Sequence, residues 1–149
     1  MVSAIIVGTD GSDTAAIAVA QAVELAHALR ARLTVVSAYE PVPEGRLRTE
    51  RLSAPQDVQW AVNPRADVLA MLESAARNAR EAGVEQVETV ARVGDAADAI
   101  LDVAEEQGCD LIVVGNKGMT GATRFLLGSV PNKVSHHAPC SVLIVRTSY

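Results

Sequence analysis

Short apolar segments that end at a glycine or a turn alternate along this chain with longer, helix-favouring segments. The first apolar segment, Ala4-Ile5-Ile6-Val7, is followed directly by Gly8. A continuous apolar run of this length suits a strand that is buried on both faces, as strands of parallel sheets are. The alanine-rich segment 16–31 favours a helix, and 33–39 is rich in β-branched residues. A strand, a helix and a strand in this order predict a right-handed βαβ unit.

The same alternation continues to the end of the chain. Further helices are expected at 65–82, 95–106 and 129–137, and further strands at 84–93, 109–115 and 141–145. The pattern predicts an α/β fold over 1–149 as a single domain, a three-layer sandwich in which helices cover both faces of a five-stranded parallel sheet. The positions expected to face the sheet are Ile17, Val23 and Leu29 in the first helix and Val68, Leu69, Leu72, Ala75 and Ala76 in the second.

The segment at about 40–64 interrupts this pattern. It contains four prolines and several charged residues between them, and it shows no regular periodicity. A loop of this length inside a compact domain is uncommon, and it serves either as a mobile surface excursion or as a lid or partner contact. The sequence leaves both interpretations open.

The charge and aromatic content argue against nucleic acid as a partner. The chain has 18 acidic and 13 basic residues, a formal net charge of −5, and four aromatic residues in all. A nucleic-acid binder needs a basic stripe, and a single-strand binder adds aromatic stacking platforms. No apolar run approaches the roughly 20 residues of a membrane span, and no secretory leader is recognisable. A cytoplasmic location without membrane association is therefore expected.

The two cysteines, Cys109 and Cys140, each lie beside a segment expected to be a strand. Neither belongs to a C-x-x-C motif, which zinc-binding and redox-active cysteines in intracellular proteins often share. We therefore expect both to be small buried residues.

A glycine-rich segment joins the fourth expected strand to the last expected helix. It reads Gly115-Asn116-Lys117-Gly118, then nine residues, then Gly128-Ser129-Val130-Pro131. Glycines let successive backbone amides approach an anion closely, and a helix N-terminus that follows them favours negative charge. This arrangement predicts a phosphate site in which the hydroxyl of Ser129 donates a hydrogen bond. The simpler alternative is a set of turns in which Ser129 only caps its helix.

Ligands of such folds bind beyond the carboxyl ends of the strands, where the strand order reverses. The segment Gly8 to Ser12 and the segment from Gly115 onward should therefore share one edge of the sheet. There Asp10 would accept a hydrogen bond from a ribose hydroxyl or hold Mg²⁺ near phosphates, or alternatively form an Asx turn. Asn116 has two interpretations, a ligand contact or a left-handed turn position. Two cations of the segment either neutralise phosphates or are solvated: Lys117 and Arg124.

The spacing G-x2-G-x9-G-S resembles the ATP-binding motif of the universal stress protein family, and Val7 to Ser12 looks like the first-strand turn of that family. The resemblance covers essentially the whole chain. It implies a Rossmann-like fold with strand order 3-2-1-4-5, an adenine nucleotide as the ligand, and a homodimer formed through the last strand, 141–147.

The resemblance also implies roles for individual residues. It places Asp10 near the ribose and the phosphates, where it would contact Mg²⁺ through the nucleotide. The adenine wall would consist of Gly8, Thr9 and Ala38. The phosphate and ribose loop would consist of Gly115, Gly118, Gly128, Ser129 and Val130, with Asn116 as a further contact.

These observations predict a regulatory adenine-nucleotide-binding stress-response protein that acts as a sensor. Whether it takes ATP, AMP or cyclic AMP stays open. The motifs G-x4-G-K-[ST], G-x-G-x-x-G and G-x-S-x-G are absent from the sequence, and no catalytic residue is assigned. Two alternatives are a slow ATPase or self-phosphorylating protein, and a partner-docking module with an empty loop.

Overall fold

The computed structural model describes residues 1–40, 64–116 and 127–147 of the chain. The expected loop at about 40–64 lies almost wholly outside these residues, as do Lys117, Gly118 and Arg124. Among the described residues the elements are β1 (Ala4–Gly8), α1 (Asp13–Leu29), β2 (Arg32–Tyr39), α3 (Pro64–Glu81), β3 (Val87–Val93), α4 (Ala96–Gln107), β4 (Leu111–Gly115), α5 (Ser129–His137) and β5 (Ser141–Val145).

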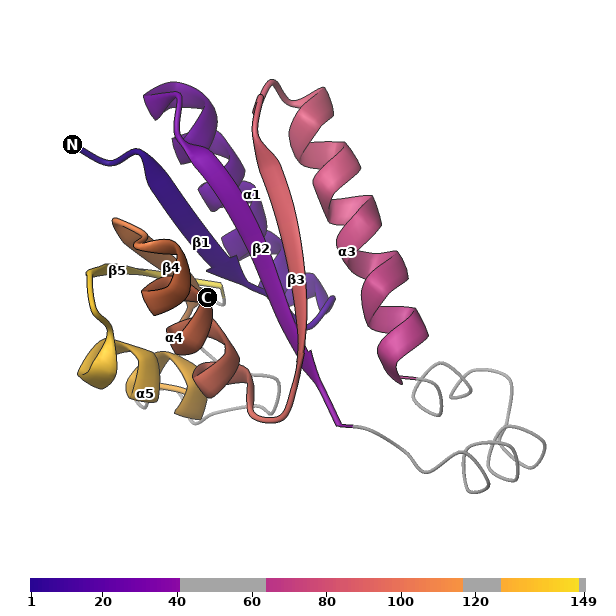
Figure 1. Cartoon of the computed structure of the whole chain (residues 1–149), viewed down its shortest axis with the longest axis vertical. Helices are drawn as coiled ribbons and strands as arrows, with labels where there is room; N and C mark the ends of the chain where they lie inside the picture. The colour runs from indigo at the N-terminus through magenta and orange to yellow at the C-terminus, as the bar shows by residue number, and fades with distance from the viewer. Residues whose placement is uncertain (41–63, 117–126, 148–149) are drawn as a thin grey trace.

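All five strands pair in parallel in the order β3-β2-β1-β4-β5, as predicted. Helices α1 and α3 cover one face of the sheet, and α4 and α5 cover the other (Figure 1). The central strand β1 pairs with β2 on one side and β4 on the other, so that Val7 lies opposite both Val35 and Val113. The strand order therefore reverses at β1, and the crevice of a doubly wound sheet opens at such a reversal.

Alternate residues of the central strands enter two separate cores. Val7, Val35 and Val113 are fully buried under α1 and α3, whereas Ile6 and Ile112 are buried under α4 and α5. Each strand consequently needs apolar side chains on both faces, which explains the unbroken apolar runs in the sequence.

The inward face of α1 differs in part from the expected one, although Val23 is partly buried against the core as expected. The buried residues are Ala18, Ala22 and Ala26, whereas Ile17 is 42% exposed and Leu29 is 47% exposed. Alanines four residues apart form a narrow stripe, and their small side chains let the helix lie close to the sheet. Ile17 points away from this stripe, because it is one residue, or about 100° of helix rotation, from Ala18. Leu29 is the last residue of the helix.

The second expected face is correct except at one position. Leu72 and Ala76 of α3 are buried, and Val68 and Ala75 are partly buried against the same core. Leu69 is 41% exposed, so its expected inward position is wrong.

Two strands begin later than expected because helix-ending motifs occupy the preceding residues. Gly83 and Gly108 follow α3 and α4 with φ of 106° and 60°, in the left-handed region that favours glycine. The next amides then bond back to their helices, Val84 N to the Ala79 carbonyl at 3.1 Å and Cys109 N to the Ala104 carbonyl at 3.2 Å. Strands β3 and β4 therefore start at Val87 and Leu111.

Candidate functional site

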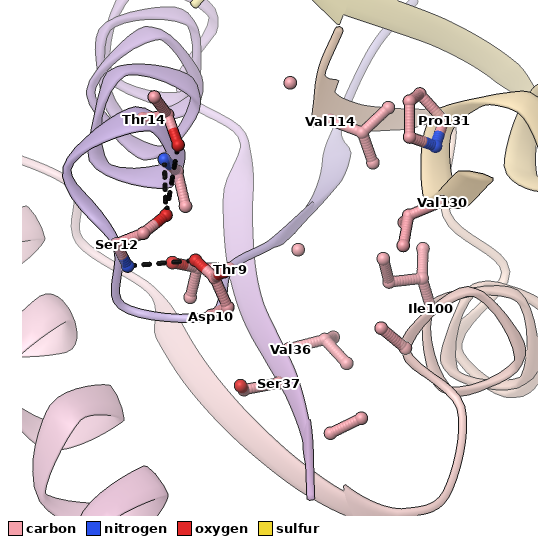
Figure 2. Close-up of a pocket in the computed structure, with 15 residues that line it drawn as sticks. Thr9, Asp10, Ser12, Thr14, Val36, Ser37, Ile100, Val114, Val130 and Pro131 are labelled. Carbon is pink, nitrogen blue, oxygen red and sulfur yellow. Dashed lines mark hydrogen bonds between the residues drawn. The ribbon is translucent and has the colours of Figure 1, made fainter. Parts of the chain in front are cut away.

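A pocket lies at the carboxyl ends of β1, β2 and β4, where the strand order reverses. Its empty space, including the mouth that is open to solvent, is about 530 Å³. The residues around it come from these three strand ends and from the beginnings of α1, α4 and α5 (Figure 2). The two sequence segments that were expected to share one edge of the sheet do so here.

The turn from β1 to α1 forms one side of the pocket. Thr9 Oγ1 accepts a hydrogen bond from the Gly11 amide at 3.1 Å, and Asp10 Oδ1 accepts one from the Ser12 amide at 2.9 Å. Ser12 Oγ accepts from the Ala15 amide at 3.2 Å and so caps α1. Asp10 therefore forms the Asx turn that was one of its two interpretations. No described residue donates to its other oxygen, Oδ2, although Asp10 also lines the pocket.

Three helices begin at the pocket. Ser12 at the start of α1, Ala96 at the start of α4 and Val130 in the first turn of α5 all line it. The amides at a helix start carry partial positive charge, so three such starts favour an anion between them.

Helix α5 has the most open of these starts. Its N-cap is Gly128, which provides no side-chain hydrogen bond, and the first helical bond is from the Asn132 amide to the Gly128 carbonyl at 3.0 Å. The amides of Ser129 and Val130 therefore lie before the first intrahelical bond and have no acceptor within the helix. Pro131, the next residue, has no N–H to satisfy. The first turn of α5 thus offers two backbone donors to a ligand.

The opposite side of the pocket is apolar. Val36, Ile100 and Val114 are 1%, 3% and 2% exposed, and Ala38 lies beside them at the end of β2. Ile100 of α4 approaches the end of β1 so closely that a Cβ placed on Gly8 would overlap its Cδ1 atom. A side chain at position 8 would therefore require the end of the Ile100 side chain to shift.

Asn116, the residue after β4, forms hydrogen bonds to β5, to the residue before α5 and to Thr147. Its amide donates to the Val145 carbonyl at 2.8 Å, and its carbonyl accepts from the Gly128 amide at 3.0 Å. Its side-chain Oδ1 accepts from both the amide and the hydroxyl of Thr147, at 2.8 and 2.9 Å. Arg30 is the only non-glycine residue in the described part of the chain with a positive φ, so the left-handed interpretation of Asn116 is wrong. The Gly128 amide is likewise already paired with a protein acceptor.

The structure brings most of the predicted site residues to the pocket. Those that line it are Gly8, Thr9, Asp10, Ala38, Gly115 and Val130. Asn116, Gly128 and Ser129 are next to the pocket in sequence but are not among its lining residues. Gly118 lies outside the described residues.

Sequence reasoning missed nine lining residues: Ser12, Thr14, Ala15, Val36, Ser37, Ala96, Ile100, Val114 and Pro131. Three of them, Ser37, Val114 and Pro131, are direct neighbours of predicted positions. Ala96 and Ile100 had a usable signal, because the turn from β3 to α4 at Gly94 and Asp95 must also lie at the carboxyl edge of a parallel sheet.

Within the described ranges no three His, Cys, Asp or Glu residues gather where they would hold a metal ion. A cation beside Asp10 would accordingly need further ligands from bound phosphates. The helices of the described residues also include none that is long and apolar enough to span a bilayer.

A parallel sheet covered on both faces, with an open crevice at the strand reversal and helix starts around it, defines a Rossmann-like α/β protein. The chain belongs to the universal stress protein family, whose model matches residues 1–146.

Similar proteins match over nearly their full length. The chain is 40% identical to universal stress protein Rv1636 of Mycobacterium tuberculosis (strain ATCC 25618 / H37Rv), over 97% of this chain and 96% of that protein. It resembles a solved universal stress protein in complex with cAMP at 35% identity and a TM-score of 0.74, over 99% and 98% of the two chains. The universal stress protein of Archaeoglobus fulgidus in complex with dAMP is 25% identical, with a TM-score of 0.68 over 98% and 100%.

Proposed function

We propose that this protein binds an adenine nucleotide in the pocket at the carboxyl edge of the sheet and acts as a nucleotide sensor. The observation that carries the proposal is that the pocket combines an apolar lining with the start of a helix. The apolar lining suits a flat aromatic base, and the first-turn amides of α5, which have no acceptor within the helix, suit a phosphate.

The residues of the pocket divide naturally between the parts of a nucleotide. The base lies against Ala38 and Val36, and Gly8 and Thr9 line the pocket along the edge of the base. The ribose lies near Asp10, whose Oδ2 is free of described donors. The phosphate is held by the backbone at Gly115, Ser129 and Val130, together with Gly118 of the same motif. Gly128, whose amide is bonded to the Asn116 carbonyl, positions the start of α5.

Two similar structures support the choice of adenine. One of those proteins is in complex with cAMP and the other with dAMP, so both ligands carry adenine and a single phosphorus. The wider motif, G-x2-G-x9-G-S, is the reason to include ATP among the candidates, with Mg²⁺ bound through its phosphates. We expect the chain to form a single domain over residues 1–149. We expect it to be located in the cytoplasm, where adenine nucleotides are abundant.

The test is calorimetric titration of the purified chain with ATP, ADP, AMP and cyclic AMP, each with and without Mg²⁺, and with GTP as the control for the base. We expect saturable binding of at least one adenine nucleotide and a weaker response to GTP. If no adenine nucleotide binds, or if guanine and adenine nucleotides bind equally well, the proposal is wrong. Native mass spectrometry of freshly purified protein then distinguishes a sensor from an empty docking module, because only the sensor copurifies with a nucleotide.

A sensor fits the pocket better than an enzyme does. Among the described residues that line the pocket, Asp10 is the only one with a titratable side chain, and one of its oxygens is engaged in the Asx turn. Phosphoryl transfer needs a group that positions the nucleophile and cations that stabilise the transferred charge. We therefore propose stoichiometric binding of Mg-ATP without sustained release of phosphate. Regulation further requires two conformations that bind the nucleotide unequally.

We also propose a homodimer formed through the last strand. Strand β5 is at the edge of the sheet and pairs with β4 alone. Its side chains are poorly covered, since Ile144 is 37% exposed and Leu143 and Val145 are only partly buried. An edge strand with uncovered apolar side chains is a suitable surface for a second copy of the chain.

A further inference from the structure

The two cysteines of the chain meet at the edge of the sheet opposite to the pocket. Cys109 lies two residues before β4 and Cys140 lies directly before β5, so both are at the amino ends of their strands. Their sulfur atoms are 3.3 Å apart, and both thiols are free. No sequence motif indicated this contact, because 31 positions separate the two residues.

The backbone fixes both cysteines in place. Cys109 follows the left-handed Gly108, its amide bonds to the Ala104 carbonyl, and the amide of Asp110 bonds to the Ala4 carbonyl at 2.9 Å. Cys140 precedes Ser141, which is the register partner of Leu111.

Neighbouring strands are about 4.8 Å apart, and an offset of one residue adds about 3.3 Å along the strand. These two displacements give Cα atoms about 6 Å apart, within the roughly 4.4–6.8 Å that a disulfide spans.

The two thiols differ in their surroundings. Cys109 is 8% exposed among the apolar residues under α4, whereas Cys140 is only partly buried at the margin of the same core. Burial, together with the contact with Cys140, raises the pKa of the Cys109 thiol to about 12. Cys109 therefore keeps its proton at neutral pH, and Cys140 is the sulfur that a small reagent from solvent reaches first.

We propose that Cys109 and Cys140 form a redox-modification site, at which a hydroperoxide converts the two thiols into an intramolecular disulfide. The Cys140 thiolate attacks one oxygen of the peroxide and breaks the O–O bond, which yields a sulfenic acid and, with one proton, water or an alcohol. The sulfur of Cys109 then attacks the sulfur of Cys140 and displaces hydroxide, which takes the Cys109 proton and leaves as water. Two thiols lose two electrons in total, and the peroxide gains them.

The disulfide would close a ring that contains β4, the glycine-rich segment and α5. Cross-links that close rings of this length stabilise a protein chiefly by restricting its unfolded chain. For a chain of this size we expect oxidation to raise the Tm by roughly 5–15 °C. Binding of a nucleotide is not needed for this effect, so the inference stands apart from the proposed function.

The experiment treats the reduced full-length protein with hydrogen peroxide, labels the remaining thiols with a maleimide and measures the intact mass. After peroxide treatment we expect the native protein to accept no maleimide at either cysteine and to be lighter than the reduced protein by two hydrogens. Peptide mapping should show a link between Cys109 and Cys140. Dithiothreitol should restore both labels and the lower Tm. In C109A, which retains only Cys140, dimedone should trap a sulfenic acid, and peroxide should leave the Tm unchanged.

Three results would each overturn the inference. The first is that both thiols of the native protein would still accept the maleimide after a peroxide treatment that oxidises the sulfur of Cys140 in C109A. The second is a disulfide that joins two chains instead of closing within one, as seen on a non-reducing gel. The third is a native protein that proceeds to a sulfinic acid without forming a link. If C109A does not fold, labelling and mapping of the unsubstituted protein decide the question alone.

Discussion

The carbonyl oxygen of Asn116 accepts a hydrogen bond from the amide of Gly128 at 3.0 Å. The bond joins the residue after β4 to the N-cap of α5, and so it fixes where the open first turn of α5 lies relative to the sheet. Through Oδ1, the same asparagine also holds Thr147, just beyond β5. A residue that resembles a ligand contact in the sequence is therefore part of the framework that positions the pocket.

Replacing Asn116 with alanine should destabilise the protein by about 1–3 kcal/mol, because the largely buried amide and hydroxyl of Thr147 would lose their shared acceptor. Urea unfolding measures the change. The matched control is N116D, which keeps an oxygen at the position of Oδ1 and should lose less stability. Equal stability of N116A and the unsubstituted protein would show that these bonds contribute nothing.

The close approach of Ile100 to Gly8 gives a second prediction. In G8A the new Cβ overlaps Cδ1 of Ile100, so overpacking should cost about 1–3 kcal/mol and weaken nucleotide binding at the same edge. Substituting Ile100 with valine removes Cδ1, so the double variant G8A/I100V should be more stable than the sum of the two single changes implies. Urea unfolding of all four proteins gives this coupling, and strictly additive costs would contradict the contact.

The fold could be predicted because local sequence signals agree with tertiary structure. Helix α5 and strand β5 have the predicted bounds, and Asp95 and Gly108 flank α4 as predicted. The errors arose at positions where tertiary packing decides which side chains are buried. Periodicity did not reveal that α1 contacts the sheet through alanines and exposes Ile17. A hydrophobic stripe in the sequence does not show how close to the sheet a helix must lie.

The site could be predicted only in part. The turn around Asp10 and the first turn of α5 carry local signals, namely glycines, an Asx turn and a helix start. The role of Asn116 depends on Val145 and Thr147, about thirty residues away, and the contact of Cys109 with Cys140 is equally distant in sequence. Spacing motifs report neighbours along the chain, so contacts between separate elements remain invisible to them.

The hydroxyl of Ser129 provides a direct test of the phosphate position. If it donates to a phosphate, S129A should weaken nucleotide binding by about tenfold, the effect of one hydrogen bond to a charged group. Calorimetry gives the Kd. Ser135, an exposed serine of the same helix whose hydroxyl donates to the Asn132 carbonyl at 2.9 Å, is the matched control. The prediction is wrong if S129A and S135A bind the nucleotide with the same Kd.

Strand β5 can be tested as the dimer surface by placing a charge on it. I144K should shift the protein from dimer to monomer, because a lysine at this partly exposed position would be buried without a partner when two edge strands meet. Light scattering measures the molar mass. L69K is the control, since Leu69 is similarly exposed but lies on α3, on a different element. A dimer that persists in I144K, or dissociates equally in L69K, would exclude β5 as the contact.

The carboxylate of Asp110 predicts how stability depends on pH. Its Oδ2 accepts hydrogen bonds from the Ser3 amide at 2.9 Å and from the Ser3 hydroxyl and the Ala4 amide at 3.0 Å each. These donors, the Ser3 amide first, hold the pKa of Asp110 below its ordinary value of 3.8. A lowered folded-state pKa means that the charged form is stabilised by folding. Its contribution is therefore complete above the unfolded-state pKa and is lost as the pH falls through the folded-state value.

D110N should accordingly have a lower Tm than the unsubstituted protein at pH 7, because an amide attracts the three donors less strongly than a carboxylate does. The difference should shrink as the pH falls below 3.8 and through the lower folded-state pKa, where the carboxyl group of the unsubstituted protein also becomes neutral. Thermal unfolding between pH 2.5 and 7 measures it. E105Q removes an exposed carboxylate of α4 for which the described residues provide no partner, and its Tm should follow that of the unsubstituted protein throughout. A D110N difference that is constant with pH would mean that shape, and not charge, accounts for the effect of Asp110.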